Sequence, residues 1–592
     1  MIKHKTQLLI LGIILSLCAG CEKLSEQDIY KRPDWLPGKL YTTVSVQENL
    51  TLFTECLQLT GLDKIIDVSG SWTVFAPNDE AMKQYLSENH YSGISDIPKD
   101  ELERIAKFHI IQNPWSLEQL KILNVNGWRT DKGTSSTSYA YKRETILKNP
   151  VGKYWIKRKN NMDKIVIDST QSDRYKMVYV ESRKYVPIFY DEYLDINGIT
   201  SADFSFYFGR VYERGNVYYA GAKILKSDIF AENGFVHVID RVVSPMLNAK
   251  ELLEREMPGE TYKLFLAMVY WYYPDFTPNI TATYNQPAAR LGGQVDTLWD
   301  LNYSRPAFTL HNELTGYIST DANETLAKHN GLFVPTDNAF REFIDGILTA
   351  KSGFPHWTDY KSLPEDIVAI IVNQHFKPSP MYPSTSQYNE IFRGKGRFPQ
   401  NEGNIIRKEF GSNCTFIGFD KYIPDRVFTS VTGPVLCRPD YSIFRLAMQY
   451  SGVLNTISDY KGKLYFFPIP DYALMSDSSL MLNWIDKEEN RFNFMAYDRN
   501  MHQMVVIGSN TIKNWILNHV GTLLPNGTGN KEMIRTLGGK TITWDLSNNT
   551  IRGTLPSTVG YKGTEVAICT PARLLEPADN GETWAVSHWF NF

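Results

Sequence analysis

The clearest pattern along the chain is a short apolar stretch that ends at a proline and is followed at once by a polar helix start. Within residues 72–82, positions 73–75 favour a strand, and Pro77 cannot donate a hydrogen bond to a sheet. Asn78 is a good helix N-cap, and Asp79 lies in the first turn, where the helix dipole favours acidic side chains. The pattern predicts a strand that turns directly into a helix.

The same pattern returns at residues 331–340 and, in a weaker form, at residues 464–474. An amphipathic helix is expected before each copy, and a helix that ends in a histidine is expected after it. The preceding helices fall at residues 50–62, 262–273 and 441–454, and the histidines are His109, His375 and His519. Three copies of one arrangement predict an array of similar modules rather than a single fold.

A second motif closes the first copy at residues 233–245. Asn233 and Gly234 favour a turn with positive φ, and the residues after them are apolar on both faces, as in a buried strand. The corresponding stretch of the second copy is expected at residues 413–424. In the third copy the match is limited to the end of the motif, at residues 572–577.

The pairing of these two motifs resembles the fasciclin-like domain family. The positions that carry the resemblance are Phe75, Pro77, Asp79, His109, Asn233, Gly234, His237 and Asp240 in the first copy, and Phe333, Pro335, Asp337 and His375 in the second. The resemblance implies an α/β (α+β) wedge with a small twisted β-sheet and a flanking helical layer. Members of this family are mostly extracellular or surface-attached adhesion and binding modules without an established active site.

We therefore predict three tandem fasciclin-like domains, at residues 38–250, 251–437 and 438–592, of which the third is the most divergent. A chain of 592 residues is too long for one core. The first two domains exceed the family's usual length because of inserts at residues 127–217 and 277–330. These inserts either carry binding specificity or are hairpins that cover a neighbouring domain.

The amino terminus has the features of an export signal at residues 1–21. Lys3 and Lys5 precede an apolar run at residues 8–17, which is too short to span a bilayer, and small residues stand before Cys21. This resembles a bacterial lipoprotein signal that leaves Cys21 lipidated; an ordinary secretory signal is the alternative. The polar, partly acidic tether at residues 22–37 is similar to that of Bacteroidetes-type surface lipoproteins. We expect a lipid-anchored protein of the outer membrane, exposed at the cell surface.

The bulk composition, with 43% hydrophobic and 21% charged residues, is that of an ordinary globular protein. A net charge of −3 without a basic stripe gives no reason to expect nucleic acid as a partner. The cysteines lack zinc-ligand spacing and are expected to be buried thiols. If any two of them form a disulfide, the pair is Cys414 and Cys437. No metal and no cofactor is expected.

The sequence contains no convincing catalytic motif, and we predict that the protein is not an enzyme. The three helix-ending histidines and His237 are expected to hydrogen-bond to nearby backbone. Asp79 and Asp337 are expected to begin helices rather than to act as acids. An enzyme hidden in an insert would need clustered carboxylates or a perturbed histidine in a deep pocket.

Aromatic side chains are the best candidates for binding. Trp271 lies in an aromatic run at residues 268–276, and Trp299 and Tyr303 lie in the second insert. Such rings stack on sugars and anchor protein interfaces. The leading hypothesis is a non-catalytic adhesion or protein-binding lipoprotein. Its partner is either a protein at the outer membrane, as in an accessory of a nutrient-uptake complex, or an extracellular polymer. The alternative is a carbohydrate-binding accessory protein for glycan capture.

Overall fold

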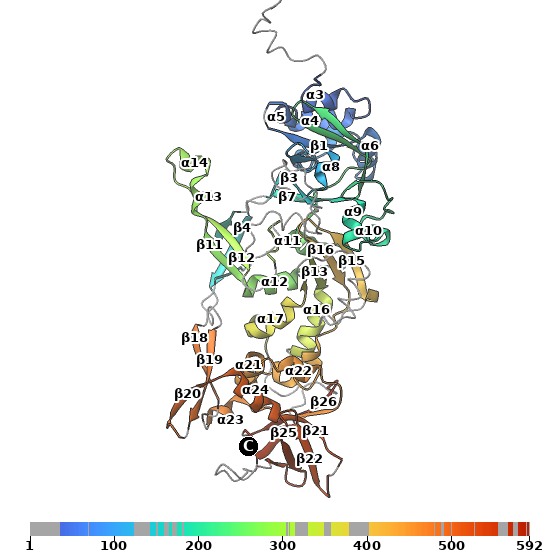
Figure 1. The fold of residues 1–592 in the computed structure, drawn as a ribbon. Coiled ribbons are helices and arrows are strands. Elements are labelled where there is room, and N and C mark those ends of the chain that lie inside the picture. Colours follow the sequence, from blue (N-terminus) through green and yellow to red (C-terminus); the bar gives the residue numbers. More distant parts are fainter. Residues whose placement is uncertain are drawn as a thin grey trace, which may run out of the picture. The chain divides into compact units, whose positions relative to one another are not determined.

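The computed structural model describes residues 36–68, 70–122, 142–149, 152–158, 165–167, 175–179, 183–303, 306, 308–313, 329–348, 357–377, 402–476, 478, 480–486, 491–498, 500–525, 527–553, 566–571, 578–587 and 589–590. The fold is mixed α/β, with several small twisted sheets and helices beside them (Figure 1). The chain divides into two compact units. One comprises Met1–Gln119 and Ala222–Val242, and the other comprises Leu120–Gly221 and Val243–Phe592.

The first module lies in the first unit and has the predicted strand-to-helix turn. Strand β1 (Trp72–Pro77) leads into helix α6 (Asp79–Glu88). Strand β1 pairs in parallel with β10 (Gly234–Ile239) and antiparallel with β2 (Ile110–Gln112), and β9 (Ala222–Ala231) continues the sheet beyond β10. The remaining helices are α3 (Leu40–Ser45), α4 (Thr51–Thr60), α5 (Leu62–Val68), α7 (Lys99–Phe108) and α8 (Leu117–Leu120). The two motif stretches, far apart in sequence, are therefore neighbouring strands.

The second module repeats this arrangement in the second unit. Strand β13 (Asn330–Pro335) lies between β16 (Cys414–Phe419), which is parallel to it, and β14 (Phe376–Lys377), which is antiparallel. Strand β15 (Ile405–Phe410) completes the sheet. The helices are α11 (Ala249–Glu254), α12 (Lys263–Tyr272), α16 (Asp337–Phe343), α17 (Glu365–Asn373), α19 (Arg426–Thr429) and α20 (Gly433–Leu436).

The third module has the same central strands but a larger sheet than the second module. Strand β17 (Leu464–Phe466) lies between the parallel β26 (Gly581–Val586) and the antiparallel β21 (Val520–Leu523). The sheet closes through β22 (Lys531–Thr536), β23 (Thr541–Asp545), β24 (Thr550–Gly553) and β25 (Val566–Pro571). A separate sheet contains β18 (Met481–Asp486), β19 (Arg491–Asp498) and β20 (Gln503–Ile507). The helices are α21 (Ser442–Tyr450), α22 (Leu454–Ser458), α23 (Asp471–Ser476) and α24 (Ser509–Asn518).

The closing strand of the third module is β26, so its assignment to residues 572–577 was wrong. Those residues lie outside the described part of the chain. Strand β26 begins at Gly581 and is preceded by Asn580, the same pair as Gly234 and Asn233 at the start of β10. The two glycines have φ of 149° and 159°, and a Cβ atom on either would lie within 2 Å of a backbone carbonyl oxygen on the parallel strand, at 1.9 and 1.8 Å respectively. Only glycine fits there.

The second and third modules share one hydrophobic core rather than having one each. Phe343 of α16 and Phe428 of α19 belong to the same cluster as Phe444 of α21 and Phe466 of β17. A buried ion pair joins the helices on the two sides, because Arg445 Nε of α21 lies 2.7 Å from Asp366 Oδ2 of α17. The expected boundary at residues 437 and 438 therefore runs through a continuous apolar interior.

The first insert folds with the second module. Its strands β4 (Gly152–Arg158), β5 (Ile165–Ile167) and β6 (Tyr175–Val178) join β11 (Pro274–Pro278) and β12 (Leu298–Tyr303) of the second insert in the order β11-β12-β6-β4-β5. Three further strands of this insert are β3 (Lys142–Lys148), β7 (Arg183–Phe189) and β8 (Tyr218–Tyr219), and its helices are α9 (Asp191–Ile196) and α10 (Ser201–Phe208). Of the two roles left open by the sequence, this placement matches hairpins that cover a neighbouring domain.

The predicted signal peptide, Cys21 and nearly all of the tether lie outside the described residues. Within the described part of the chain, no helix combines the length and the apolar character needed to cross a bilayer.

Candidate functional site

The aspartate at the start of each motif helix holds the beginning of an earlier helix. Asp79 accepts hydrogen bonds from Thr51 Oγ1 at 2.7 Å and from the Leu52 amide at 2.9 Å, at the start of α4. Asp337 accepts from Thr261 Oγ1 and from the Leu264 amide, both at 2.7 Å, at the start of α12. The carboxylates satisfy amides that a helix start leaves without a partner, so their role is structural, as predicted.

The third module has the same contact, although its motif is the weakest in sequence. Asp471 accepts from the amides of Ser442 and Ile443, both at 2.9 Å, at the start of α21. The helix caps also recur, because the side chain of Asn78 accepts from the Ala81 amide in the first module. One local arrangement therefore fixes the helix before each motif strand in all three modules.

The motif asparagine is the second recurring contact. The Asn233 side chain accepts from the Leu40 amide at 2.9 Å and donates to the Ile66 carbonyl oxygen at 2.6 Å. Asn413 and Asn580 do the same in the other modules, accepting from the amides of Ala249 and Val431, both at 2.9 Å. Each asparagine thus ties the closing strand of its module to a segment that precedes the motif strand.

The three helix-ending histidines are fully buried and contact backbone. The Nδ1 atoms of His109, His375 and His519 lie 2.8, 2.6 and 2.8 Å from the carbonyl oxygens of Ile105, Phe333 and Phe467. Burial lowers their pKa from 6.5 to about 4, 3 and 3, so the rings are neutral near pH 7. The prediction of a backbone-bonded histidine is confirmed for all three.

His237 lies inside the first sheet in the same state. Its Nε2 lies 3.0 Å from the Trp115 carbonyl oxygen, its Nδ1 accepts from the Asp228 amide at 3.2 Å, and burial lowers its pKa. Its ring also contacts Phe75, with centroids 5.1 Å apart. Asp240, at the end of the same motif, accepts from the Lys223 amide at 2.8 Å. No acid–base group in this set faces a ligand.

The three predicted binding aromatics do not form an open platform. Tyr303 is 0% exposed, so a surface binding role for it is ruled out by its burial in the core. Trp299 carries the ammonium of Lys176 3.4 Å from its ring centroid, and half-buried Trp271 carries that of Lys361 at 4.5 Å. These cation–π contacts occupy ring faces that a sugar would need.

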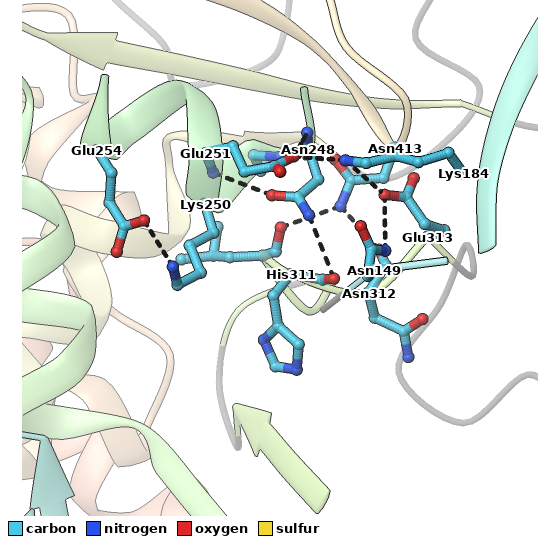
Figure 2. Close-up of polar contacts among 12 residues, drawn as sticks. Asn149, Lys184, Asn248, Lys250, Glu251, Glu254, His311, Asn312, Glu313 and Asn413 are labelled. Atoms are coloured by element: carbon cyan, nitrogen blue, oxygen red, sulfur yellow. Dashed lines mark hydrogen bonds and ion pairs between the residues drawn. The ribbon is translucent and has the colours of Figure 1, made fainter. Parts of the chain in front are cut away.

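The structure brings together a buried charged cluster that no sequence motif indicates (Figure 2). Lys184 of β7 contacts the Glu251 carboxylate of α11, and its Nζ lies 3.1 Å from Glu313 Oε1. Glu313 also accepts from Asn149 Nδ2 at 3.1 Å. The side chains of Lys184 and Glu313 are 1% and 0% exposed, so these two charges are out of reach of solutes, whereas that of Glu251 is 25% exposed.

The cluster holds the first insert against the second module. Lys184 and Asn149 come from the insert, and Glu251 and Glu313 come from the module. Aromatic contacts reinforce this junction, because Phe410 of β15 lies 5.7 and 5.6 Å from the rings of Tyr207 and Phe208 in α10. Sequence reasoning missed the cluster because its members are far apart along the chain and follow no spacing rule.

A second lysine of the insert lies beside this cluster. Lys142 of β3 is 1% exposed, and burial lowers its pKa from 10.5 to about 7, against the attraction of Glu313. The thiol of Cys414 lies in the same field, and burial raises its pKa well above 9.0. Cys414 and Cys437 are both free, so the disulfide considered between them is absent. Among the described residues, no group of three or more His, Cys, Asp or Glu side chains is placed to hold a metal ion.

Comparison with known proteins places the family resemblance in the first module. The sequence model of the fasciclin domain matches residues 48–171. A solved FAS1 domain pair from the insect cell adhesion molecule Fasciclin I is 14% identical, with 65% of this chain and 96% of that chain covered and a TM-score of 0.18. No curated protein matches the chain. The family match coincides with the stretch that carries β1, the Asn78 cap and the buried His109. Residues 48–171 are therefore similar in sequence to the fasciclin domain, and the closing strand β10 of the first module lies beyond them.

Proposed function

We propose that this protein is a non-catalytic binding lipoprotein of the bacterial outer membrane, built from three fasciclin-like modules. In this proposal acyl chains on Cys21 hold it at the cell surface, where it acts as an accessory of a membrane protein complex for nutrient uptake. The fasciclin domain and the recurrence of its aspartate, asparagine and histidine contacts support the modular part of the proposal. The amino-terminal sequence pattern supports the anchor.

The non-catalytic part of the proposal rests on one observation. Every motif side chain that is capable of acid–base chemistry makes its contacts within the protein. The motif carboxylates bind helix starts, and the motif histidines are buried and neutral. A group in either state cannot exchange protons with a substrate near pH 7. Binding through the surface is the activity that these modules retain.

The shared core of the second and third modules supports a role in holding partners. Because one hydrophobic cluster runs through both, they present their surfaces in a fixed relation rather than as beads on a flexible linker. A preorganised surface loses less conformational entropy on binding, which strengthens contacts that are individually weak.

The experiment that tests the proposal uses the full-length chain with a carboxyl-terminal affinity tag in its native membrane. We expect it to co-purify from detergent extracts with one outer-membrane protein at constant ratio, and Cys21→Ser to leave the membrane fraction and lose fatty-acid label. Recovery of the chain alone would refute the accessory role. An unlabelled Cys21 in the wild-type chain would refute the anchor.

The glycan-capture alternative gains no support from the predicted aromatics. Tyr303 is buried, and lysines cover a face of both Trp271 and Trp299. In the described parts of the two inserts, the exposed large aromatic side chains are Tyr175 and Tyr284. They come from different inserts, whereas a sugar platform needs neighbouring rings in one plane. We therefore favour a protein partner.

A further inference from the structure

The second insert forms an arm with a helical tip. Strands β11 and β12 pair as an antiparallel ribbon, and between them the chain forms α13 (Ile280–Tyr284) and α14 (Pro287–Arg290) (Figure 1). We call residues 279–297 the arm tip. The ribbon is anchored at the end next to the tip, where Leu298 of β12 is paired with Met177 of β6.

Hydrogen bonds fix the conformation of the arm tip. The Asn279 side chain caps α13 by accepting from the Ala282 amide at 2.8 Å and donates to Asp300 Oδ1 at 3.0 Å. On the other side, Thr283 Oγ1 accepts from the Leu298 amide at 2.9 Å. Gln286 Nε2 closes the tip by donating to the Asp296 carbonyl oxygen at 2.9 Å. The arm tip therefore has a fixed conformation and a defined surface.

That surface is apolar and almost free of charge. Ile280, Tyr284 and Leu291 are 67%, 71% and 88% exposed. Ile280 and Tyr284 are four residues apart on one short helix, so they share a face. Within residues 279–297 the charged side chains are those of Arg290 and Asp296. A rigid tip that exposes large apolar side chains is the signature of an interaction site rather than of a solvated loop.

The size and charge of the tip favour one kind of partner. Three exposed side chains offer on the order of 400 Å², about half of what one partner contributes to a stable interface. A symmetric contact with a second copy would rest on this small area alone and would be too small for a stable dimer. Helices of five and four residues are too short for interfacial membrane binding, which also needs several basic residues.

We propose that the arm tip docks into an apolar, uncharged pocket of a different protein, with Tyr284 and Leu291 as the main anchors. This inference rests on the proposed function, because it assigns the surface through which the partner is held. The tip adds a compact hot spot to other contacts of the chain, and its fixed conformation keeps the entropy loss on docking small.

The first test is photocrosslinking of the full chain in living cells, with a benzophenone amino acid in place of Tyr284. Tyr472 on α23 is the matched control, because it is also a tyrosine and is 65% exposed. We expect one protein adduct from position 284, absent from position 472 and abolished by Leu291→Ser. No adduct at 284, the same adduct from both positions, an adduct with a second copy or an adduct with lipid would each overturn the proposal.

The second test compares co-purification of the crosslinked protein with the wild type, Tyr284→Ser, Leu291→Ser and Tyr472→Ser. The substituted side chains are exposed, so folding is retained and is checked by circular dichroism. We expect both tip substitutions to weaken binding of the purified partner by roughly tenfold or more and Tyr472→Ser to leave it unchanged. Unchanged binding by the tip variants refutes the docking site while the accessory function stands. If nothing co-purifies with the wild type, the accessory function itself fails.

Discussion

The buried ion pair between α17 and α21 gives the sharpest prediction about the shared core. The side chains of Asp366 and Arg445 are 7% and 3% exposed. Asp366 accepts from Arg445 Nε at 2.7 Å, from Arg445 Nη2 at 3.4 Å and from Gln449 Nε2 at 3.1 Å. Asp366→Ala removes all three hydrogen bonds and leaves the guanidinium buried among apolar side chains. Breaking such a pair destabilises a protein by about 3–5 kcal/mol.

Hydrogen exchange monitored by mass spectrometry measures this effect locally. The free energy of opening of peptides from α17 and α21 is expected to fall by that amount in Asp366→Ala. The double variant Asp366→Leu/Arg445→Met removes both charges and restores apolar packing, so we expect it to be more stable than the single variant. The matched control is Asp195→Ala, which breaks an ion pair with Arg214 whose side chains are 56% and 64% exposed. No change in exchange is expected for the control.

Two results would refute this reasoning. A loss below about 1 kcal/mol in Asp366→Ala, as for exposed pairs, would show that water reaches the pair. Losses confined to α17, with α21 unaffected, would show that the second and third modules open separately and do not share a core.

Three further predictions concern the recurring contacts. Asn580→Ala leaves the Val431 amide without its acceptor and is expected to lower the free energy of unfolding by about 1–3 kcal/mol, measured by urea denaturation. Gly581→Ala places a Cβ atom 1.9 Å from a backbone oxygen at φ 149°, so we expect no soluble folded chain. Gly529 has φ 65°, and a Cβ atom there would meet nothing within 4 Å, so Gly529→Ala is expected to fold with a smaller loss of soluble yield. Equal soluble yields of the two variants would contradict the assignment of β26. Burial lowers the pKa of His519 from 6.5 to about 3. As the pH falls, His519 is therefore protonated in the unfolded chain before it is protonated in the folded chain. The contribution of this residue to stability is therefore complete above pH 6.5 and is lost as the pH falls towards 3, by ~1.4 kcal/mol per pH unit. His519→Gln is expected to flatten the decline in urea midpoint across that range, and an unchanged slope would contradict burial of the neutral ring.

Local chemistry was enough to predict the modular elements. A strand that ends at Pro77, a cap at Asn78 and an acidic first turn each depend on residues within a few positions of one another. The helix expected at residues 50–62 is present as α4, which ends before Gly61 with its φ of 69°. The backbone partner of His109 also followed, because Ile105 is four residues away, whereas the carbonyl partners of His375 and His519 are 42 and 52 residues away.

The closing strand of the third module shows where local reasoning failed. Residues 572–577 resemble the end of the motif, but the strand that pairs with β17 begins at Gly581. The decisive feature is the close approach of Gly581 to the Leu464 carbonyl oxygen. The pair Asn580 and Gly581 repeats Asn233 and Gly234 and is the sequence signal that could have found this strand. Pairing partners in a parallel sheet are chosen by contacts across the fold.

By itself, the sequence determined the three strand-to-helix turns, the helices around them, the glycine and asparagine positions of the closing strand in the first module, and the family resemblance. These features follow from short-range rules of capping, φ preference and apolar periodicity. Only the tertiary structure decided that the second and third modules share a core, that the first insert folds with the second module through Lys184 and Glu313, and that Tyr303 is buried while Tyr284 is exposed. The physical reason is that burial and charge pairing are set by neighbours in space, and those neighbours come from distant parts of the chain.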